Sequence, residues 1–176
     1  MKKIVLFLGV FVSMMFGHAQ EPSGKKSNYL GHVQTIDSTI ETLYKVISGE
    51  KGEARQWELF KFLFKPGAKL IPSGKNTKGD YQVRYMKPED YIKGSGDWLV
   101  ENGFFEKELS RTVNAYGNIA HVFSTYESFK SEADEKPFMR GINSIQLFHD
   151  GTRWWVINIY WANETKDNPI PKKYLP

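Results

Sequence analysis

The stretch "RGINSIQLFHDGTRWWVINIYW", residues 140–161, holds two mainly apolar runs on either side of Asp150 and Gly151. An Asp-Gly pair between apolar runs is a hairpin signal, so the two runs are predicted to form neighbouring antiparallel strands. Each run carries one asparagine near its middle, Asn143 in the first and Asn158 in the second. Because a buried amide needs a hydrogen-bonding partner, the two asparagines indicate a polar place within an apolar wall.

A second hairpin is predicted directly before this one. From residue 104 the apolar and polar residues alternate, which is typical of strands, and Gly117-Asn118 forms a two-residue turn between the runs 104–116 and 119–129. This turn fixes which residues face each other across the two strands. The pairs predicted on one face are Val113 with Val122, Arg111 with Ser124, and Leu109 with Tyr126.

The N-terminal half has the spacing of helices. Ile36, Ile40, Leu43 and Ile47 are separated by four, three and four residues, which predicts a helix over this segment. Two further helices are predicted over 53–64 and from 88 to 103, with short strands over 68–71 and 81–86. Because the helices come first and an antiparallel meander comes last, the chain is predicted to be an α+β protein.

The first nineteen residues have the order of an export signal. Lys2 and Lys3 precede an apolar run over residues 4–16, and small residues lead up to Ala19. That run is short for a bilayer span, so we expect a cleaved signal without a membrane anchor, and an exported protein, periplasmic or secreted, that begins at Gln20. The expected organisation is a signal peptide over 1–19, a disordered leader over 20–32, one domain over 33–162 and an extended, proline-rich tail over 163–176.

The composition argues against several classes of function. The net charge of +4 comes from 24 basic and 20 acidic residues, and so mild an excess gives no reason to expect a nucleic-acid partner. The absence of cysteine excludes disulfides, thiol nucleophiles and cysteine-ligated metals. No set of three ligating residues has the spacing of a metal site, so neither a metal ion nor another cofactor is expected.

The order of helix, helix, short strand, helix and four long strands, ending in "GTRWWVINIYW", resembles the NTF2-like superfamily over residues 33–162. This superfamily includes the SnoaL-like polyketide cyclases and the ketosteroid isomerases. The resemblance implies a curved antiparallel sheet with three N-terminal helices that together form a cone around a pocket. It also implies a homodimer through the convex face of the sheet.

The resemblance also implies which residues line the pocket. Asn143 falls where ketosteroid isomerases carry an aspartate of the oxyanion hole, so its face of the sheet is expected to be concave. Strand alternation then places six residues on that face as ligand-binding candidates: Arg111, Ser124, Tyr126, Asn143, Asn158 and Tyr160. The opposite face would carry Glu106, Glu108 and Glu127 as a solvated surface, with His121 beside them. Its apolar residues Ile142, Trp155, Ile157, Ile159 and Trp161 would form the dimer interface, or the core if the register slips by one residue. The alternative is that Asn143 and Asn158 bond to each other across the strands, or face water.

The chemistry of ketosteroid isomerases is not expected. Their carboxylate base would fall at Ile71, Pro72 or Ser73, and none of these is an acid. We therefore expect a domain that binds a small, partly apolar ligand in a conical pocket, with Arg111 favouring an anionic group. Two alternatives stay open: an isomerase, dehydratase or cyclase with an unusual polar set, and a dimeric protein-interaction module.

Overall fold

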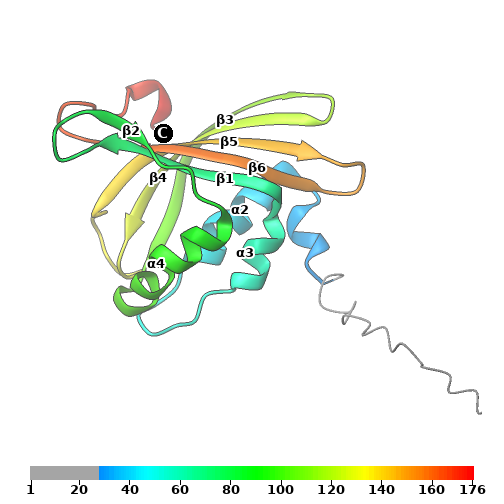
Figure 1. Ribbon diagram of the computed structural model, residues 1–176, viewed down its shortest axis with the longest axis horizontal. Helices are drawn as coiled ribbons and strands as arrows, with labels where there is room; N and C mark the ends of the chain where they lie inside the picture. The colour runs from blue at the N-terminus through cyan, green and yellow to red at the C-terminus, as the bar shows by residue number, and fades with distance from the viewer. Residues whose placement is uncertain (1–27) are drawn as a thin grey trace, which may run out of the picture.

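The computed structural model of the protein describes residues 28–176 and has a helical layer packed on one six-stranded sheet (Figure 1). The helical segments are η1 (Leu30–Val33), α2 (Ile36–Ile47), α3 (Trp57–Leu63), α4 (Pro88–Asn102) and η2 (Lys172–Tyr174). The strands are β1 (Phe64–Lys75), β2 (Tyr81–Val83), β3 (Phe105–Tyr116), β4 (Ile119–Phe129), β5 (Met139–His149) and β6 (Trp154–Asn163). The predicted α+β class and the four long C-terminal strands are confirmed.

The sheet is mixed rather than wholly antiparallel. Its strand order is β2-β1-β6-β5-β4-β3, and the strands from β3 to β6 form the predicted antiparallel meander. β1, however, runs parallel to β6, with Leu70 opposite Ile159. A parallel pair needs a long crossover connection, and here β2, α4 and the first three strands of the meander provide it. The prediction of an antiparallel sheet is therefore wrong at this one strand pair.

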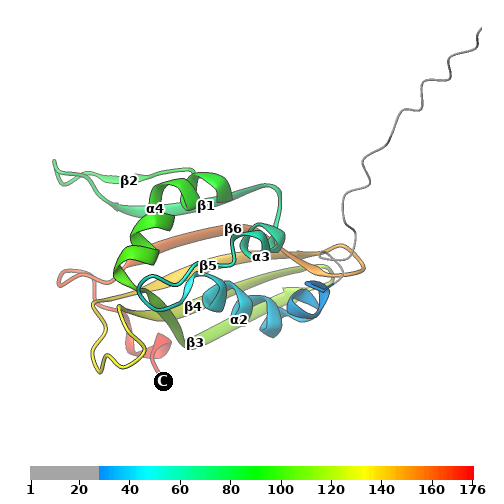
Figure 2. The same ribbon diagram turned by 90° about the horizontal axis from the view of Figure 1, so that it is seen from below.

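The helices α2, α3 and α4 all lie on one face of the curved sheet, which we call the inner face (Figures 1 and 2). α2 begins at a capping box in which the side chains of Thr35 and Ser38 bond to each other's backbone N–H groups. Its apolar residues Ile40, Leu43 and Ile47 are buried in the core, as their spacing predicts. The main hydrophobic core therefore lies between these helices and the inner face.

Arg55 connects α2 to α4 through hydrogen bonds. Its buried guanidinium donates from Nε to the carbonyl oxygen of Ile47 at 2.9 Å and from Nη2 to that of Leu99 at 2.8 Å. Both carbonyls belong to the last turns of their helices, where carbonyl oxygens lack a partner within the helix. Arg55 therefore holds the two helices in a fixed relation above the inner face.

A β-bulge in β3 changes the face of the sheet on which the residues at the start of that strand lie. Near the β3–β4 turn the predicted pairs are confirmed, but Leu109 has no partner and Glu108 lies opposite Tyr126 in its place. A bulge adds one residue to one strand, and the residues beyond it exchange faces. Glu106 and Glu108 therefore lie on the inner face, and the prediction that they form a solvated outer surface is wrong.

A second bulge does the same in β6. The pairing passes from Val156 directly to Asn158, which leaves Ile157 without a partner in β5. Asn158 and Tyr160 consequently lie on the outer face, and their predicted place beside Asn143 is wrong. The residues that the bulge turns to the inner face, and so removes from the predicted dimer interface, are Ile159 and Trp161.

The two ends of the chain differ in what the structure describes. The predicted signal peptide and most of the predicted leader lie outside the described residues. The C-terminal tail turns back over the outer face, where Thr125 Oγ1 donates to the carbonyl oxygen of Tyr174 at 2.7 Å. The ring centroid of Tyr174 lies 5.0 Å from that of Phe123, and Ile170 is buried. The tail therefore packs against the sheet.

Gly141 is predicted to tolerate no side chain, because a Cβ atom there would lie 2.5 Å from Tyr126 Oη and 2.6 Å from the carbonyl oxygen of Ala162. We expect Gly141→Ala to lower the free energy of unfolding by about 1–3 kcal/mol, the usual effect of overpacking. Thermal and urea unfolding measure the change. Gly74→Ala is the matched control, since a Cβ at this strand glycine meets no atom within 4 Å. An equal effect of the two substitutions would contradict the steric explanation.

Candidate functional site

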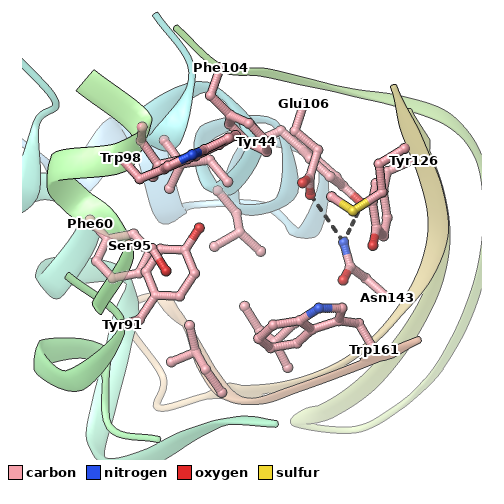
Figure 3. Close-up of a pocket in the computed structure, with 16 residues that line it drawn as sticks. Tyr44, Phe60, Tyr91, Ser95, Trp98, Phe104, Glu106, Tyr126, Asn143 and Trp161 are labelled. Carbon is pink, nitrogen blue, oxygen red and sulfur yellow. Dashed lines mark hydrogen bonds between the residues drawn. The ribbon is translucent and has the colours of Figure 1, made fainter. Parts of the chain in front are cut away.

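A cavity of about 210 Å³ lies between the helices and the inner face of the sheet (Figure 3). Its wall is mostly apolar and aromatic, and it combines side chains from α2, α3, α4 and the strands. Its large apolar side chains include Phe60, Trp98, Phe104, Met139 and Trp161. Such a surface favours a ligand that is itself largely apolar.

Glu106 and Asn143 place polar groups in this apolar wall. Asn143 Nδ2 donates to Glu106 Oε1 at 3.4 Å and to Tyr44 Oη at 3.2 Å (Figure 3). Glu106 comes from β3, Asn143 from β5 and Tyr44 from α2, so the cluster forms only when helix and sheet pack together. The three residues define the polar end of the cavity.

The carboxyl group of Glu106 has an unusual acidity. Burial raises its pKa from the ordinary value of 4.5 to about 7, and the hydrogen bonds from Asn143 and Ser128 lower it only in part. Desolvation acts this way because it disfavours the charged form of a carboxyl group. Near neutral pH Glu106 is therefore present both as an acid and as a carboxylate.

Three tyrosines surround Glu106, and all of them stay protonated. Burial raises the pKa of Tyr44, Tyr91 and Tyr126 above the ordinary value of 10.0, and the nearby charge of Glu106 raises each of them further. The hydroxyl group of Tyr91 points into the cavity from α4, on the wall across from Asn143 (Figure 3). The hydroxyl group of Tyr126 is used elsewhere, because it donates to Asn163 Oδ1 at 2.8 Å.

Arg111 lies outside the cavity wall, in a pair of salt bridges. Its Nη2 atom lies 2.7 Å from Glu108 Oε2 and its Nη1 atom lies 2.9 Å from Asp37 Oδ1. Ser124 stands beside this group and donates from Oγ to Glu108 Oε1. The charge of Arg111 is therefore neutralised within the protein, which removes the basis for expecting an anionic ligand.

The structure brings together only part of the predicted site. Tyr126 and Asn143 line the cavity, and Ser124 lies behind its wall, 2.7 Å from Tyr44 Oη. Asn158 and Tyr160 are on the outer face, where Asn158 Nδ2 donates to Gln146 Oε1 at 3.2 Å. The alternative in which the two asparagines bond to each other is therefore wrong as well.

The sequence reasoning missed Glu106, Tyr44, Tyr91 and Trp161. The position of Tyr44 could have been predicted from the sequence. It follows Leu43 on the apolar side of a helix that the spacing of its apolar residues indicates clearly. Glu106 and Trp161 had none, since their direction depends on bulges that strand alternation does not reveal. A side chain separated from the turn by an unrecognised bulge is placed on the wrong face.

The described residues offer little for metal or histidine chemistry. Within residues 28–176 no group of three or more histidine, aspartate or glutamate side chains is placed to hold a metal ion. His32 contacts Thr42, and His121 contacts Ser144, so both lie away from the cavity wall. The same part of the chain contains no helix long and apolar enough to cross a membrane.

Glu106 is predicted to make stability depend on pH. Its pKa in the folded protein, about 7, lies above the ordinary 4.5, so between these values the folded state binds more protons than the unfolded state. The free energy of unfolding should therefore fall as the pH rises from about 4.5 to 7. The fall should reach up to about 2 kcal/mol, because partial exposure of the side chain to solvent reduces the full effect of the pKa shift. Above pH 7 this contribution stays constant.

Urea unfolding across this range measures the effect. Glu106→Gln should flatten the profile, because the amide does not titrate, and should be more stable than the wild type at pH 8. Glu101→Gln, at an exposed position of α4, is the control and should leave the slope unchanged. A wild-type profile that is flat between pH 4.5 and 7 would show that Glu106 titrates normally.

Comparison with known proteins extends the sequence resemblance to solved structures. No family model and no curated protein matches the sequence. An NTF2-like protein of unknown function from Pseudomonas putida superposes with a TM-score of 0.56 at 12% identity, covering 85% of this chain and 95% of that one. An NTF2-like protein of unknown function from Silicibacter pomeroyi gives a TM-score of 0.52 at 14% identity, covering 78% and 98%.

A third structure, a suggested dehydratase of the NTF2-like family from Streptomyces avermitilis, gives a TM-score of 0.55 at 10% identity, covering 77% of this chain and 97% of that one. At such low identity the similarity concerns the path of the chain and leaves the chemistry of the site open. The chain therefore has the fold of the NTF2-like superfamily, as the order of its elements indicates.

Proposed function

We propose that the protein binds a small, largely apolar molecule in the cone between helices and sheet, with the polar group of the ligand at Glu106 and Asn143. The observation that carries this proposal is the contrast within one cavity, whose mostly apolar and aromatic wall holds the paired polar side chains of Glu106 and Asn143 at one end. Ligand sites commonly combine an apolar wall with a few polar groups that orient the ligand.

The size of the cavity limits the ligand. Apolar cavities of about 150 Å³ hold a molecule such as benzene. A volume of about 210 Å³ is therefore suited to a compound of one or two rings. Since Arg111 is engaged by Glu108 and Asp37, the proposal is for a neutral ligand rather than the anionic one that the sequence favoured.

A second candidate function is proton transfer on such a ligand, and the acidity of Glu106 favours it. A carboxyl group with a pKa of about 7 can both take up and give back a proton at neutral pH. An isomerase, dehydratase or cyclase that works by general acid–base catalysis could use such a group. The stretch from Ile71 to Ser73, where the ketosteroid isomerase base would lie, supplies no acid, so Glu106 would serve alone. Glu106→Gln separates the candidates, because it should keep binding and abolish turnover.

Binding is tested with naphthalene as a fluorescent probe. Ser95→Phe should weaken binding of naphthalene at least tenfold, because Ser95 lines the cavity and the larger ring fills part of its volume. Lys93→Phe introduces the same ring at an exposed position of α4 and should bind naphthalene as the wild type does. Equal affinity of the wild type and Ser95→Phe would show that the probe binds elsewhere.

A homodimer through the outer face is also proposed, with a protein-interaction role of that face as the alternative. Ile119 and Tyr160 are exposed there, at 56% and 44% of their surface. Trp155, expected at this interface, has a local partner instead, since its Nε1 atom donates to Asp150 Oδ2 at 2.6 Å. Tyr160→Glu is therefore the sharper test and should shift the protein from dimer to monomer in light scattering. An unchanged dimer would place the interface elsewhere.

Export remains part of the proposal on the strength of the sequence. Cleavage after Ala19 leaves Gln20 as the first residue of a periplasmic or secreted protein. Intact-mass measurement of the protein recovered from its native cells should show this start or its cyclised form. A protein that retains Met1 would contradict export by a cleaved signal.

A further inference from the structure

A chain of polar contacts runs from the surface of the protein to the cavity. It starts at the ion pair of Arg111 with Glu108 and continues through Ser124 and Tyr44 to Asn143. These side chains come from β3, β4, β5 and α2. Ser124 is fully buried, and Tyr44 and Asn143 are nearly so, which leaves them few alternative partners.

The ion pair fixes the direction of every hydrogen bond in this chain. A carboxylate only accepts hydrogen bonds, so Ser124 gives its single hydroxyl proton to Glu108. Ser124 must then accept at its 2.7 Å contact with Tyr44, and Tyr44 donates. Because the proton of Tyr44 is used in this way, Tyr44 accepts from Asn143 Nδ2 at 3.2 Å. A reversed chain would need a donor at the position of Glu108.

The direction determines what the cavity presents to a ligand. Both N–H bonds of Asn143 are engaged, one with Tyr44 and the other with Glu106. The side-chain oxygen of Asn143 consequently faces away from Glu106, as Figure 3 shows. Tyr44 has no proton left for a ligand, although it is close enough to the cavity to line it. The polar end therefore offers acceptors, the oxygen of Asn143 and the carboxylate of Glu106.

We propose that the ion pair of Glu108 with Arg111 acts through Ser124 and Tyr44 to make the cavity select a neutral ligand that donates a hydrogen bond, such as an alcohol or a phenol. An ether of the same shape lacks the proton, and a carboxylate adds a negative charge beside two acceptors. Glu108, Ser124 and Tyr44 are positioning residues in this scheme. The inference rests on the proposed function, because it concerns the ligand of the same cavity.

The direction of the chain can be measured without a ligand. Neutron diffraction from a deuterated crystal at pH 8 locates the exchangeable deuterons. We expect the deuteron of Tyr44 to point at Ser124 Oγ and the ND2 group of Asn143 to face Tyr44. A deuteron on Ser124 that points at Tyr44, or an Asn143 amide turned the other way, would overturn the inference.

The selectivity is measured with three naphthalenes of similar shape at pH 8, where Glu106 is mostly ionised because its pKa is about 7. The wild type should bind 2-naphthol about tenfold more tightly than 2-methoxynaphthalene, the effect of about one hydrogen bond, and 2-naphthoate most weakly. In Ser124→Ala the proton of Tyr44 is released toward Asn143 and the cavity. The ratio of the affinities for 2-naphthol and its methyl ether should then fall clearly below that of the wild type, because Glu106 is left as the acceptor at the polar end.

Thr125→Val is the matched control. Thr125 is the neighbour of Ser124 on β4 and is equally buried, but its hydroxyl group bonds to Tyr174 on the outer face. This variant loses one buried hydroxyl and should keep the tenfold preference. Thermal unfolding of both variants checks that they are folded, and the readout is a ratio of affinities, which a general loss of stability does not change.

The outcomes separate the two claims. If none of the three naphthalenes binds, the proposed binding function fails and the selectivity built on it fails too. If they bind but the wild type does not prefer 2-naphthol, or if Ser124→Ala keeps the preference, the binding function stands and the inference is overturned.

Discussion

The two β-bulges, at Leu109 in β3 and at Ile157 in β6, are the constraint on which the site depends. Each inserts one unpaired residue, and each turns the side chains beyond it from one face of the sheet to the other. The first brings Glu106 to the inner face, and the second brings Trp161 there. Without them the cavity would lose its carboxyl group and a large part of its aromatic wall.

Glu106 is kept in the cavity at a cost to stability. Its neighbours are the amide of Asn143 and the hydroxyl groups of Ser128 and several tyrosines, and within residues 28–176 no positively charged side chain is paired with it. A carboxyl group that serves only the fold would be expected to pair with a positive charge, as Glu108 does with Arg111. The environment of Glu106 therefore differs from that of Glu108, and it supports the proposal that a ligand binds beside Glu106.

The sequence predicts local structure well and the site only in part. The helix from Ile36 to Ile47 is found where its period places it, because capping and apolar spacing are local properties. Pairing near the Gly117 turn is also found as predicted, since the turn sets the register. The predicted assignment of side chains to the two faces of the sheet fails beyond Leu109 and Ile157. Neither residue is a glycine or proline that would mark a bulge. Bulges of this kind depend on packing between strands, so alternation along one strand cannot reveal them.

Arg111 shows how correct placement can still suggest the wrong role. Strand alternation puts its side chain on the inner face, where an unpaired cation would be expected to bind an anion. The structure adds two acids that the alternation could not supply, Asp37 from the first turn of α2 and Glu108 from before the bulge. A partly buried cation that is paired with two carboxylates attracts an anionic ligand only weakly, because the carboxylates cancel its electrostatic field at short range. Its effect on the cavity is therefore indirect and passes through the hydrogen bonds that Glu108 orients.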